Sequence, residues 1–476
     1  MIAALGLSFV VSTALGALLL RTAWPGDAAG RPWPLLVALG AGLGAGVSAV
    51  LLFLWMLAFG PTRGFALAEV GLVMLLVVVA FRAGRRPAAG PAPEGGQSNS
   101  RLLPLLVAGF LVTLSAAAAA FVSTLRQHPH GQWDAWMNWD MRARMFFRGG
   151  EAWRNAFSAT FPWSHPDYPV LVPSLVARSW LYAGAETLLG PALVAATFTF
   201  GAVALLASAL AALRSTSQGL LAGMVLLSTP FFILHGTSLY ADVPLAFFFL
   251  ATMVCLALDA RQGEATTRFA VLAGVAAGLA MWTKNEGVLF SLAVGAGLIV
   301  AGGRDWAATR RRLRGFGSGL LPLLLLVASF KIAFAPPNDL LSTLDVQRTF
   351  GRLTSAHRYY LVIQAYTTHI ASFGGNGFGS AVWVLAAYLL GLGVSGTDAS
   401  RRWLRMAAIA LMLLLAGHFM VFVSMADELA RLLDSSLDRL LLQIWPSALF
   451  LFFMLVRTPE EASTGPLLIG RTIDQH

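Results

Sequence analysis

Charged residues are scarce in this chain, and their scarcity excludes two classes of protein. Only 12% of the 476 residues are charged, 57% are hydrophobic, and the mean hydropathy is +0.71. A soluble protein of this size could not cover so much apolar surface with so few charges. A disordered chain is excluded too, because its composition would be polar. The sequence therefore predicts an integral membrane protein.

Cysteine and lysine are also nearly absent. The single cysteine, Cys255, lies inside an apolar run, which excludes a disulfide framework and a cysteine-based metal site. The net charge is +10, yet only Lys284 and Lys331 are lysines, so nearly all the positive charge is arginine. No basic helix or stacking platform lies in a soluble domain, so we expect no nucleic-acid partner. In a membrane protein, excess arginine is typical of cytoplasmic loops.

Long apolar runs are abundant, and they predict an all-α polytopic membrane protein with about 13 transmembrane helices. A helix needs about 20 apolar residues to cross a hydrocarbon core of about 30 Å. The first run lacks a basic start and a clear cleavage site, so we interpret it as a spanning helix and not a removed signal. A shorter stretch, 170–182, predicts a re-entrant or interfacial helix. The predicted spans are 2–20, 35–60, 65–81, 102–125, 187–213, 219–235, 243–259, 269–283, 288–302, 315–334, 377–395, 406–424 and 441–456.

Arginine placement predicts the topology. If the predicted helices alternate, every arginine cluster reaches the same face, which the positive-inside rule makes cytoplasmic. We therefore expect a multi-pass protein of the bacterial inner (cytoplasmic) membrane, with segments 126–186 and 335–376 outside. The clusters are Arg21 with Arg31, Arg82 to Arg101, Arg214, Arg261 with Arg268, Arg304 to Arg314, Arg401 to Arg405, and Arg457.

One polar stretch divides the chain. Residues 83–101 are rich in Pro, Gly and Ser, and they predict a flexible cytoplasmic linker. The linker separates a three-helix N-terminal extension, 1–82, from a membrane module, 102–457. Residues 458–476 would form a cytoplasmic tail.

The segment from His128 to Trp180 is the longest that does not look like a membrane helix, and it is rich in Trp. It contains Asp134, Asp140, His165 and Asp167. If WDAWMNWDMRAR is an α-helix, Asp134 shares a face with Asn138, and Asp140 with Arg144. An interfacial amphipathic helix with a solvated face explains this pattern as well as a catalytic helix does.

Further polar residues are predicted at the same face. Asp242 lies at the start of a span, Lys284 and Glu286 lie in a short hairpin, and Arg439 lies at the outer start of the last span. Polar groups beside a bilayer are costly unless they pair or serve a site, so their gathering predicts one external site. Each residue also has a structural explanation: a favourable helix dipole for Asp242, a turn for the hairpin, and snorkelling for Arg439. The alternative role for Arg439 is a phosphate clamp.

These motifs together resemble the GT-C superfamily of membrane glycosyltransferases, which includes protein O-mannosyltransferases and aminoarabinose transferases of lipid A. The resemblance is carried by QWDAW, with Asp134, by SHPDYPVLVP, from His165, by YADVPLAFF, with Asp242, by TKNEG, from Lys284, and by SLDRLLLQIWP, with Arg439. It covers roughly residues 102–457 and leaves out the first three helices.

The resemblance implies inverting transfer of a sugar from a polyprenyl-phosphate carrier to a glycan, lipid or protein acceptor. It implies that Asp134 is the general base, and a partly desolvated carboxylate suits proton abstraction. The lipid phosphate needs cations, for which Arg439 and Lys284 are candidates, with Arg178 behind them; Asp242, His165, Asp167 and Glu286 would complete the substrate site. Protein mannosyltransferases typically have an acidic pair at the catalytic position and a lysine soon after their HP element, the His-Pro pair that SHPDYPVLVP contains here. In this chain Ala135 follows Asp134, and no lysine appears before Lys284. A protein acceptor is therefore not favoured over a glycan or lipid.

Three alternatives stay open. The first is a transporter or flippase for a lipid-linked saccharide, which should carry charges near mid-membrane. The second is a non-catalytic envelope-assembly subunit, which would tolerate loss of Asp134. The third is a metal site on the outer face, using His128, His130, His165, Asp167 or His235. No HExxH occurs and no metal ligands are predicted, but a divalent cation bridging Asp134 and Asp242 to the phosphate stays open as a cofactor.

Overall fold

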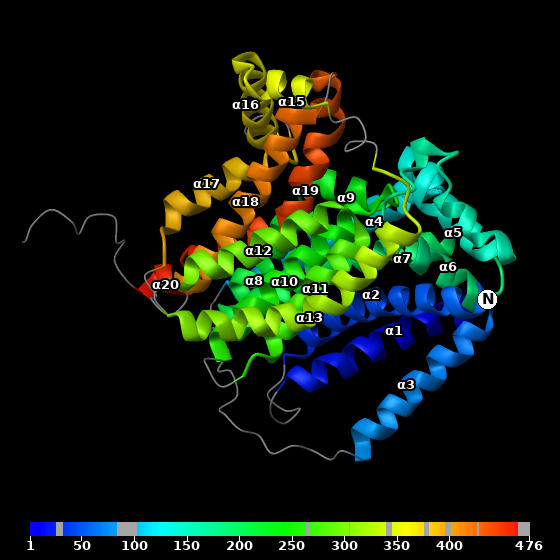
Figure 1. Ribbon diagram of the computed structural model, residues 1–476. Helices are drawn as coiled ribbons and strands as arrows, with labels where there is room; N and C mark the ends of the chain where they lie inside the picture. Colours follow the sequence, from blue (N-terminus) through cyan, green and yellow to red (C-terminus); the bar gives the residue numbers. More distant parts are fainter. Residues whose placement is uncertain are drawn as a thin grey trace, which may run out of the picture.

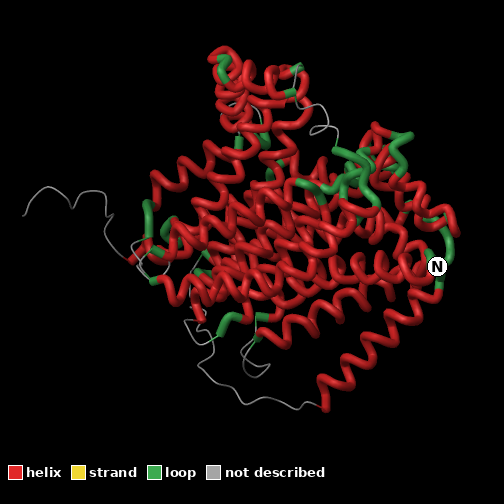
Figure 2. Tube along the Cα trace, viewed as in Figure 1, coloured by secondary structure: helices red, strands yellow, loops and turns green. Residues whose placement is uncertain are grey.

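The computed structural model consists of helices packed side by side (Figures 1 and 2). The structure describes residues 1–24, 32–82, 102–262, 266–303, 305–338, 345–375, 380–395, 401–425 and 428–464. The predicted linker 83–101 and the last part of the predicted tail lie outside these residues. Within them, the backbone forms helices and one isolated antiparallel bridge, between Val394 and Val456. The all-α prediction is confirmed.

Nine helices in the described residues are long and apolar enough to cross a membrane. Two more helices, α8 (Thr216–Leu227) and α9 (Pro230–Thr237), are long and apolar enough only as a pair, and they are bent by 64° at the break between them, as in a broken span or a re-entrant loop. Pro230, which has no N–H to donate, stands at the break. Three shorter apolar helices, α11 (Arg268–Thr283), α12 (Glu286–Gly302) and α17 (Ala381–Leu392), complete the set. The nine are α1 (Ile2–Ala23), α2 (Trp33–Phe59), α3 (Gly64–Arg82), α4 (Leu103–Gln127), α7 (Leu189–Leu213), α10 (Asp242–Gln262), α13 (Trp306–Ala333), α18 (Arg401–Met425) and α19 (Leu429–Leu455).

Helix α10 is the centre of the bundle, because all its residues from Asp242 to Asp259 are buried. Helices α1 and α2 pack directly on this bundle. A Cβ on Gly42 of α2 would lie 2.0 Å from the ring of Phe247 in α10, and one on Gly16 of α1 would lie 1.9 Å from the Gly40 carbonyl oxygen. Glycine is therefore required at both close approaches. The N-terminal helices share one core with the rest of the membrane domain.

One end of the bundle, called the loop end below, carries the non-spanning segments (Figure 1). The segment after α4 forms a π-helix, Ala135–Trp139, then α5 (Asp140–Arg148), two 3-10 turns (Gly150–Phe157 and Pro162–Ser164), and α6 (Leu171–Ala183). Helix α6 is the predicted short helix at 170–182, and it is buried from Leu171 to Leu181. Helices α15 (Val346–Leu353) and α16 (Ala356–Ser372) project from the same end beside the start of α19.

The last span differs from its prediction. Helix α19 begins at Leu429, about 12 residues before the predicted start at 441. The added turns bury Leu433 and Leu437 against Val362 of α16, which stabilises them as helix. Arg439 therefore lies well inside a helix and not at its start. This placement turns the Arg439 side chain toward the bundle, where it meets Asp242.

The opposite end, called the arginine end below, is tied together by arginine side chains. Arg21 at the end of α1 donates to the carbonyl of Ala80 in α3, and Arg261 at the end of α10 donates to that of Ala212 in α7. Arg214 pairs with Glu461 of α20 (Pro459–Thr464). These three arginines come from three of the predicted clusters, and each lies at a helix end and contacts a neighbouring helix. Their orientation relative to the cell stays a prediction.

Candidate functional site

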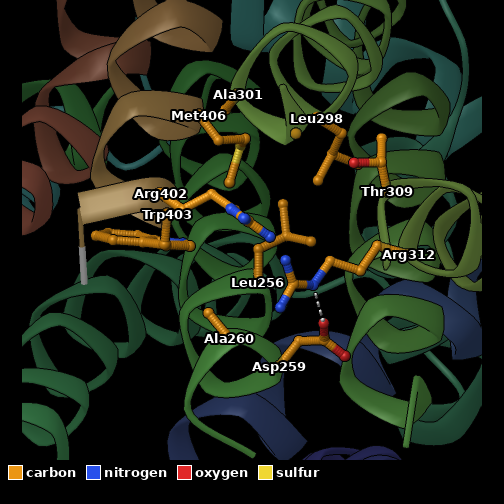
Figure 3. A pocket seen from close by; sticks show the side chains of 11 residues that line it. Leu256, Asp259, Ala260, Leu298, Ala301, Thr309, Arg312, Arg402, Trp403 and Met406 are labelled. Atoms are coloured by element: carbon orange, nitrogen blue, oxygen red, sulfur yellow. Dashed lines mark hydrogen bonds and ion pairs between the residues drawn. The ribbon is translucent and has the colours of Figure 1, made fainter. Parts of the chain in front are cut away.

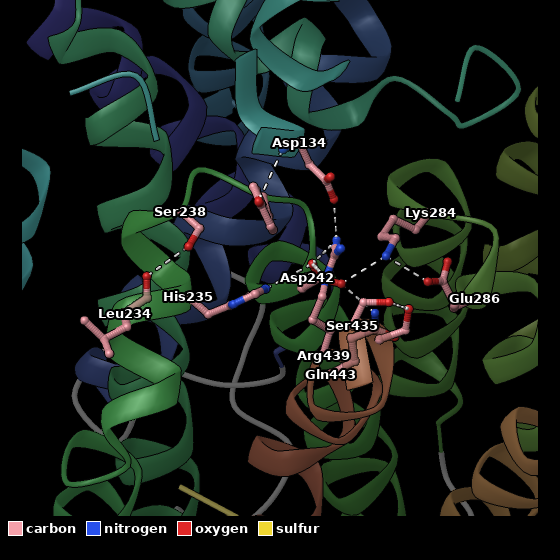
Figure 4. A network of polar contacts seen from close by, with 12 residues as sticks. Asp134, Leu234, His235, Ser238, Asp242, Lys284, Glu286, Ser435, Arg439 and Gln443 are labelled. Atoms are coloured by element: carbon pink, nitrogen blue, oxygen red, sulfur yellow. Dashed lines mark hydrogen bonds and ion pairs between the residues drawn. The ribbon is translucent and has the colours of Figure 1, made fainter. Parts of the chain in front are cut away.

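Asp242 is the most highly bonded carboxylate at the loop end (Figure 4). It is the first residue of α10 and its side chain is fully buried. Oδ1 accepts from Lys284 Nζ at 2.9 Å and from Gln443 Nε2 at 2.6 Å, while Oδ2 accepts from Arg439 and lies 3.4 Å from His235 Nε2. A buried carboxylate is tolerated only when its oxygens are paired in this way. Asp242 therefore organises the cations around it and has no free lone pair facing the surface.

Arg439 joins this buried carboxylate to a more exposed one. Its Nη2 lies 2.9 Å from Asp242 Oδ2 and 2.8 Å from Asp134 Oδ2. The side chains of Asp134 and Arg439 are 26% and 23% exposed, against 0% for Asp242, so the centre opens at the Asp134–Arg439 pair. The guanidinium lies 4.8 Å from the ring centroid of Tyr240, and the Asp134 N–H donates to the Tyr240 hydroxyl at 3.2 Å. Sequence-distant residues from three segments thus form one unit.

Lys284 is held between two carboxylates. It ends α11, and its Nζ lies 2.9 Å from Asp242 Oδ1 and 2.8 Å from Glu286 Oε1. Burial works against the charged ammonium, but Asp242 and Glu286 outweigh it and raise the pKa of Lys284 above its usual range. The side chain is only 5% exposed. Lys284 is therefore a charged, buried partner of the two acids and not a free surface cation.

The local backbone around Asp134 is unusual. The residues that follow it, Ala135–Trp139, form a π-helix, and π-helical turns occur frequently at functional sites. The α-helix considered for this stretch is therefore a π-helix at its start, and Asn138 is buried while Asp134 is 26% exposed. Leu239, one residue before Tyr240, has a positive φ of 61°. Such strain in a non-glycine residue persists only where the surroundings impose it.

The HP element forms a second polar cluster beside the first. Asp167 Oδ2 accepts from Asn285 at 2.9 Å, and Lys331 Nζ lies 3.3 Å from the same oxygen. His165 has a positive φ of 45°, and its ring stacks on Tyr168 with centroids 5.1 Å apart. Because Asn285 sits between Lys284 and Glu286 in the chain, the two clusters share one hairpin.

The sequence did not single out every residue of these clusters. Lys331 was notable only as the second lysine, yet it also donates to the Asp167 carbonyl at 2.5 Å. Gln443 and Asn338 were not expected to take part; Asn338 donates to Asp167 Oδ2 at 2.6 Å. A lysine near the end of an apolar run was the available signal for Lys331. For a glutamine inside a span and an asparagine after one, we find no signal of comparable strength.

Arg178 lies in a different place from the other predicted residues. Its Nη2 lies 2.8 Å from Glu69 Oε2, and both side chains are almost fully buried. It also donates to the carbonyl of Ser8 at 2.7 Å, and the Tyr182 hydroxyl donates to Glu69 at 2.7 Å. This ion pair fastens α6 to α1 and α3. Arg178 thus contacts the N-terminal helices and not the cluster around Asp242.

The geometry bears on the metal hypothesis as well. Among the residues that the structure describes, no three His, Cys, Asp or Glu side chains are grouped so as to hold a metal ion. Between Asp134 and Asp242, the position of a bridging cation is taken by the Arg439 guanidinium. The residues present therefore fit an arginine-bridged centre better than a metal centre.

The fold and this centre together define a polytopic α-helical membrane protein with a charged, partly open polar site at one end of its bundle. Residues 169–329 match the family model of dolichyl-phosphate-mannose-protein mannosyltransferases. This match supports membership of the GT-C superfamily of membrane glycosyltransferases. The matched part includes Asp242, Lys284 and Glu286, while Asp134 and Arg439 lie outside it. No curated protein and no solved structure matches the chain.

Proposed function

We propose that the chain moves a sugar from a polyprenyl-phosphate carrier to an acceptor hydroxyl of a glycan, lipid or protein, with inversion. The hydroxyl oxygen forms a bond to the anomeric carbon while the bond from that carbon to the phosphate oxygen breaks. The hydroxyl proton goes to Asp134, and the leaving group is polyprenyl phosphate. The family match supports a lipid-linked donor, since its description names dolichyl-phosphate-mannose.

The observation that carries this proposal is the exposed side of the centre. Asp134 and Arg439 are paired at 2.8 Å and both are about a quarter exposed. A general base must reach the proton it removes, and a phosphate is best bound by a guanidinium fork. Asp242 is less suited to be the base, because its side chain is fully buried and its oxygens already accept from Lys284, Gln443 and Arg439.

Charge balance indicates how the donor would bind. Arg439 and Lys284 face the carboxylates of Asp134, Asp242 and Glu286, so the resting centre has no cation in excess. A lipid phosphate must therefore compete for Arg439. If the phosphate replaces Asp134 on the exposed side of the guanidinium, Arg439 stays anchored by Asp242 and Asp134 is released as an ionised base. Donor binding and activation of the base are then one step.

Lys331 is a second cation available to the donor. Its side chain is 32% exposed, more than that of Arg439, although its Nζ is within 3.3 Å of Asp167. It lies in the last turn of α13, at the loop end. The HP element would thus position Lys331 from a distant helix, although no lysine occurs between that element and Lys284 in the sequence.

The site would face outward from the bacterial inner membrane, because the arginine end would face the cytoplasm. A cysteine introduced at Gly150, at the loop end, would test this orientation. It should react with a membrane-impermeant maleimide added outside the cytoplasmic membrane. Labelling only after that membrane is opened would reverse the orientation.

Transfer is tested with the full chain in liposomes and a panel of radiolabelled polyprenyl-phosphate hexoses. With a hydroxyl acceptor present to receive the hexose, we expect wild-type protein to release polyprenyl phosphate and Asp134→Asn to release none. Asp438→Asn is the matched control: it removes the same charge one residue from Arg439, from a 41% exposed side chain that pairs with His369. Movement of intact labelled donor across the bilayer without cleavage would favour the flippase alternative. Normal envelope assembly with Asp134→Asn in cells would favour the non-catalytic alternative.

A further inference from the structure

A cavity of about 200 Å³ lies at the arginine end, away from the centre described above. It opens between the ends of α10, α12, α13 and α18, and Figure 3 shows its lining. This volume is far larger than the roughly 10–15 Å³ needed to hold one water. Arg312 of α13 and Arg402 of α18 point their guanidinium groups into it (Figure 3).

The side chains that line this cavity offer hydrogen-bond donors, from Arg312, Arg402 and Trp403. Both acids near it are already bonded: Asp259 accepts from the Ala270 N–H and from Arg312, and Asp305 accepts from the Ala308 N–H and from Arg402. In the part of the chain that the structure describes, Arg312 contacts Asp259 through its Nε. With the acids satisfied, the cavity suits an anion rather than a cation.

Trp403 supplies an independent observation. Its ring lines the cavity and is 5% exposed, and its indole N–H finds no acceptor among the residues that the structure describes. A buried donor of this kind costs roughly 1–3 kcal/mol unless something accepts its hydrogen bond. Trp403 also belongs to the first turn of α18, where backbone N–H groups and the helix dipole favour an anion.

The surroundings indicate a lipid as the source of that anion. Leu256, Leu298 and Met406 make part of the lining apolar. On the outer surface nearby, Val300 is 62% exposed and Trp306 is 57% exposed. An exposed tryptophan at a helix end is typical of the headgroup level of a bilayer. An anion that enters from a membrane-facing surface of this kind would be a lipid headgroup, which is attached to acyl chains.

From these observations we infer that the cavity binds the phosphate group of an anionic phospholipid from the leaflet at the arginine end. Arg402 and Arg312 contact the phosphate oxygens, and the Trp403 N–H donates to one of them. The glycerol lies along the apolar wall. The site is a structural lipid site that clamps α18 to α10 and α13, and it is independent of the proposed sugar transfer.

The test uses the full chain purified in detergent and measures the thermal unfolding midpoint during titration with three probes: phosphatidylglycerol, phosphatidylcholine and inorganic phosphate. A ligand that binds only the folded state raises this midpoint. Phosphatidylglycerol should stabilise wild-type protein most. Arg402→Gln should weaken its apparent affinity about tenfold, the size expected for losing one charged hydrogen-bond pair.

Two further variants test whether the effect is specific to the cavity. Trp403→Phe keeps an aromatic side chain against Phe450 but removes the indole N–H together with one ring of the indole, so it should also weaken binding while the chain still folds. Arg261→Gln is the matched control, because Arg261 is an exposed arginine at the same end that binds the Ala212 carbonyl outside the cavity. Equal weakening by Arg261→Gln and Arg402→Gln would overturn the site. Stabilisation by inorganic phosphate as strong as that by lipid would overturn the lipid assignment.

Discussion

Arg439 donates two hydrogen bonds to one oxygen of Asp242, from Nε at 3.1 Å and from Nη2 at 2.9 Å, although the two residues are 197 positions apart. The pair connects α19 to α10 and leaves the same Nη2 within 2.8 Å of Asp134. The guanidinium is thus fixed on its buried side and available on its exposed side. This asymmetry is what the proposed donor-binding step requires.

Replacing Arg439 should affect donor binding more than folding. Arg439→Lys keeps the charge but loses the fork that contacts both acids, so we expect the apparent KM for a polyprenyl-phosphate hexose to rise about tenfold or more. Turnover at saturating donor should fall less. Initial rates over a range of donor concentrations measure both values. An unchanged KM would show that Arg439 does not contact the donor.

Replacing Asp242 should affect folding. Asp242→Asn leaves Lys284 and Arg439 without their shared buried carboxylate, and breaking a buried ion pair costs about 3–5 kcal/mol. We expect a lower unfolding midpoint and loss of activity together. Thermal unfolding in detergent provides the measurement, with Asp438→Asn as the control of equal charge change. A variant as stable as wild type would contradict the organising role given to Asp242.

The Arg178–Glu69 pair should behave as a structural link. Glu69→Gln removes the charge facing a buried arginine, so we expect a lower unfolding midpoint. The KM for the donor should stay unchanged in the folded fraction. The double variant Glu69→Leu with Arg178→Met should recover much of the stability, since it replaces the ion pair with apolar side chains. A raised KM in either variant would return Arg178 to the substrate site.

Asp140 should make stability depend on pH. Burial raises the pKa of Asp140 from 3.8 to about 7, with Arg144 opposing the shift. The folded state therefore binds a proton more tightly than the unfolded state, and stability falls as pH rises from about 4 through about 7. The loss is at most about 4 kcal/mol. Unfolding midpoints measured between pH 5 and 8 should fall for wild type and change less for Asp140→Asn. Parallel curves would contradict the buried, protonated state.

Most helices could be predicted from the sequence, because a run of about 20 apolar residues directly indicates a helix long enough to cross a membrane. It missed the early start of α19, where residues 429–440 are held as helix by contacts with α16 that no local pattern reveals. At the site, Arg439 and Lys284 contact Asp242, Asp134 and Glu286 join them through these two cations, and Asp167 lies in the neighbouring cluster. Arg178 instead pairs with Glu69, which belongs to helices set aside as an extension, and its role toward substrate stays a prediction. Lys331 and Gln443 reach the site only through the packing of α13 and α19.

The most direct test compares binding and turnover in Asp134→Asn. Because Arg439 no longer has to leave an ionised Asp134, the variant should bind bare polyprenyl phosphate at least as tightly as wild type. It should nevertheless release no sugar from a polyprenyl-phosphate hexose. Retained binding with lost transfer is the result the account predicts. Wild-type turnover by Asp134→Asn would contradict it.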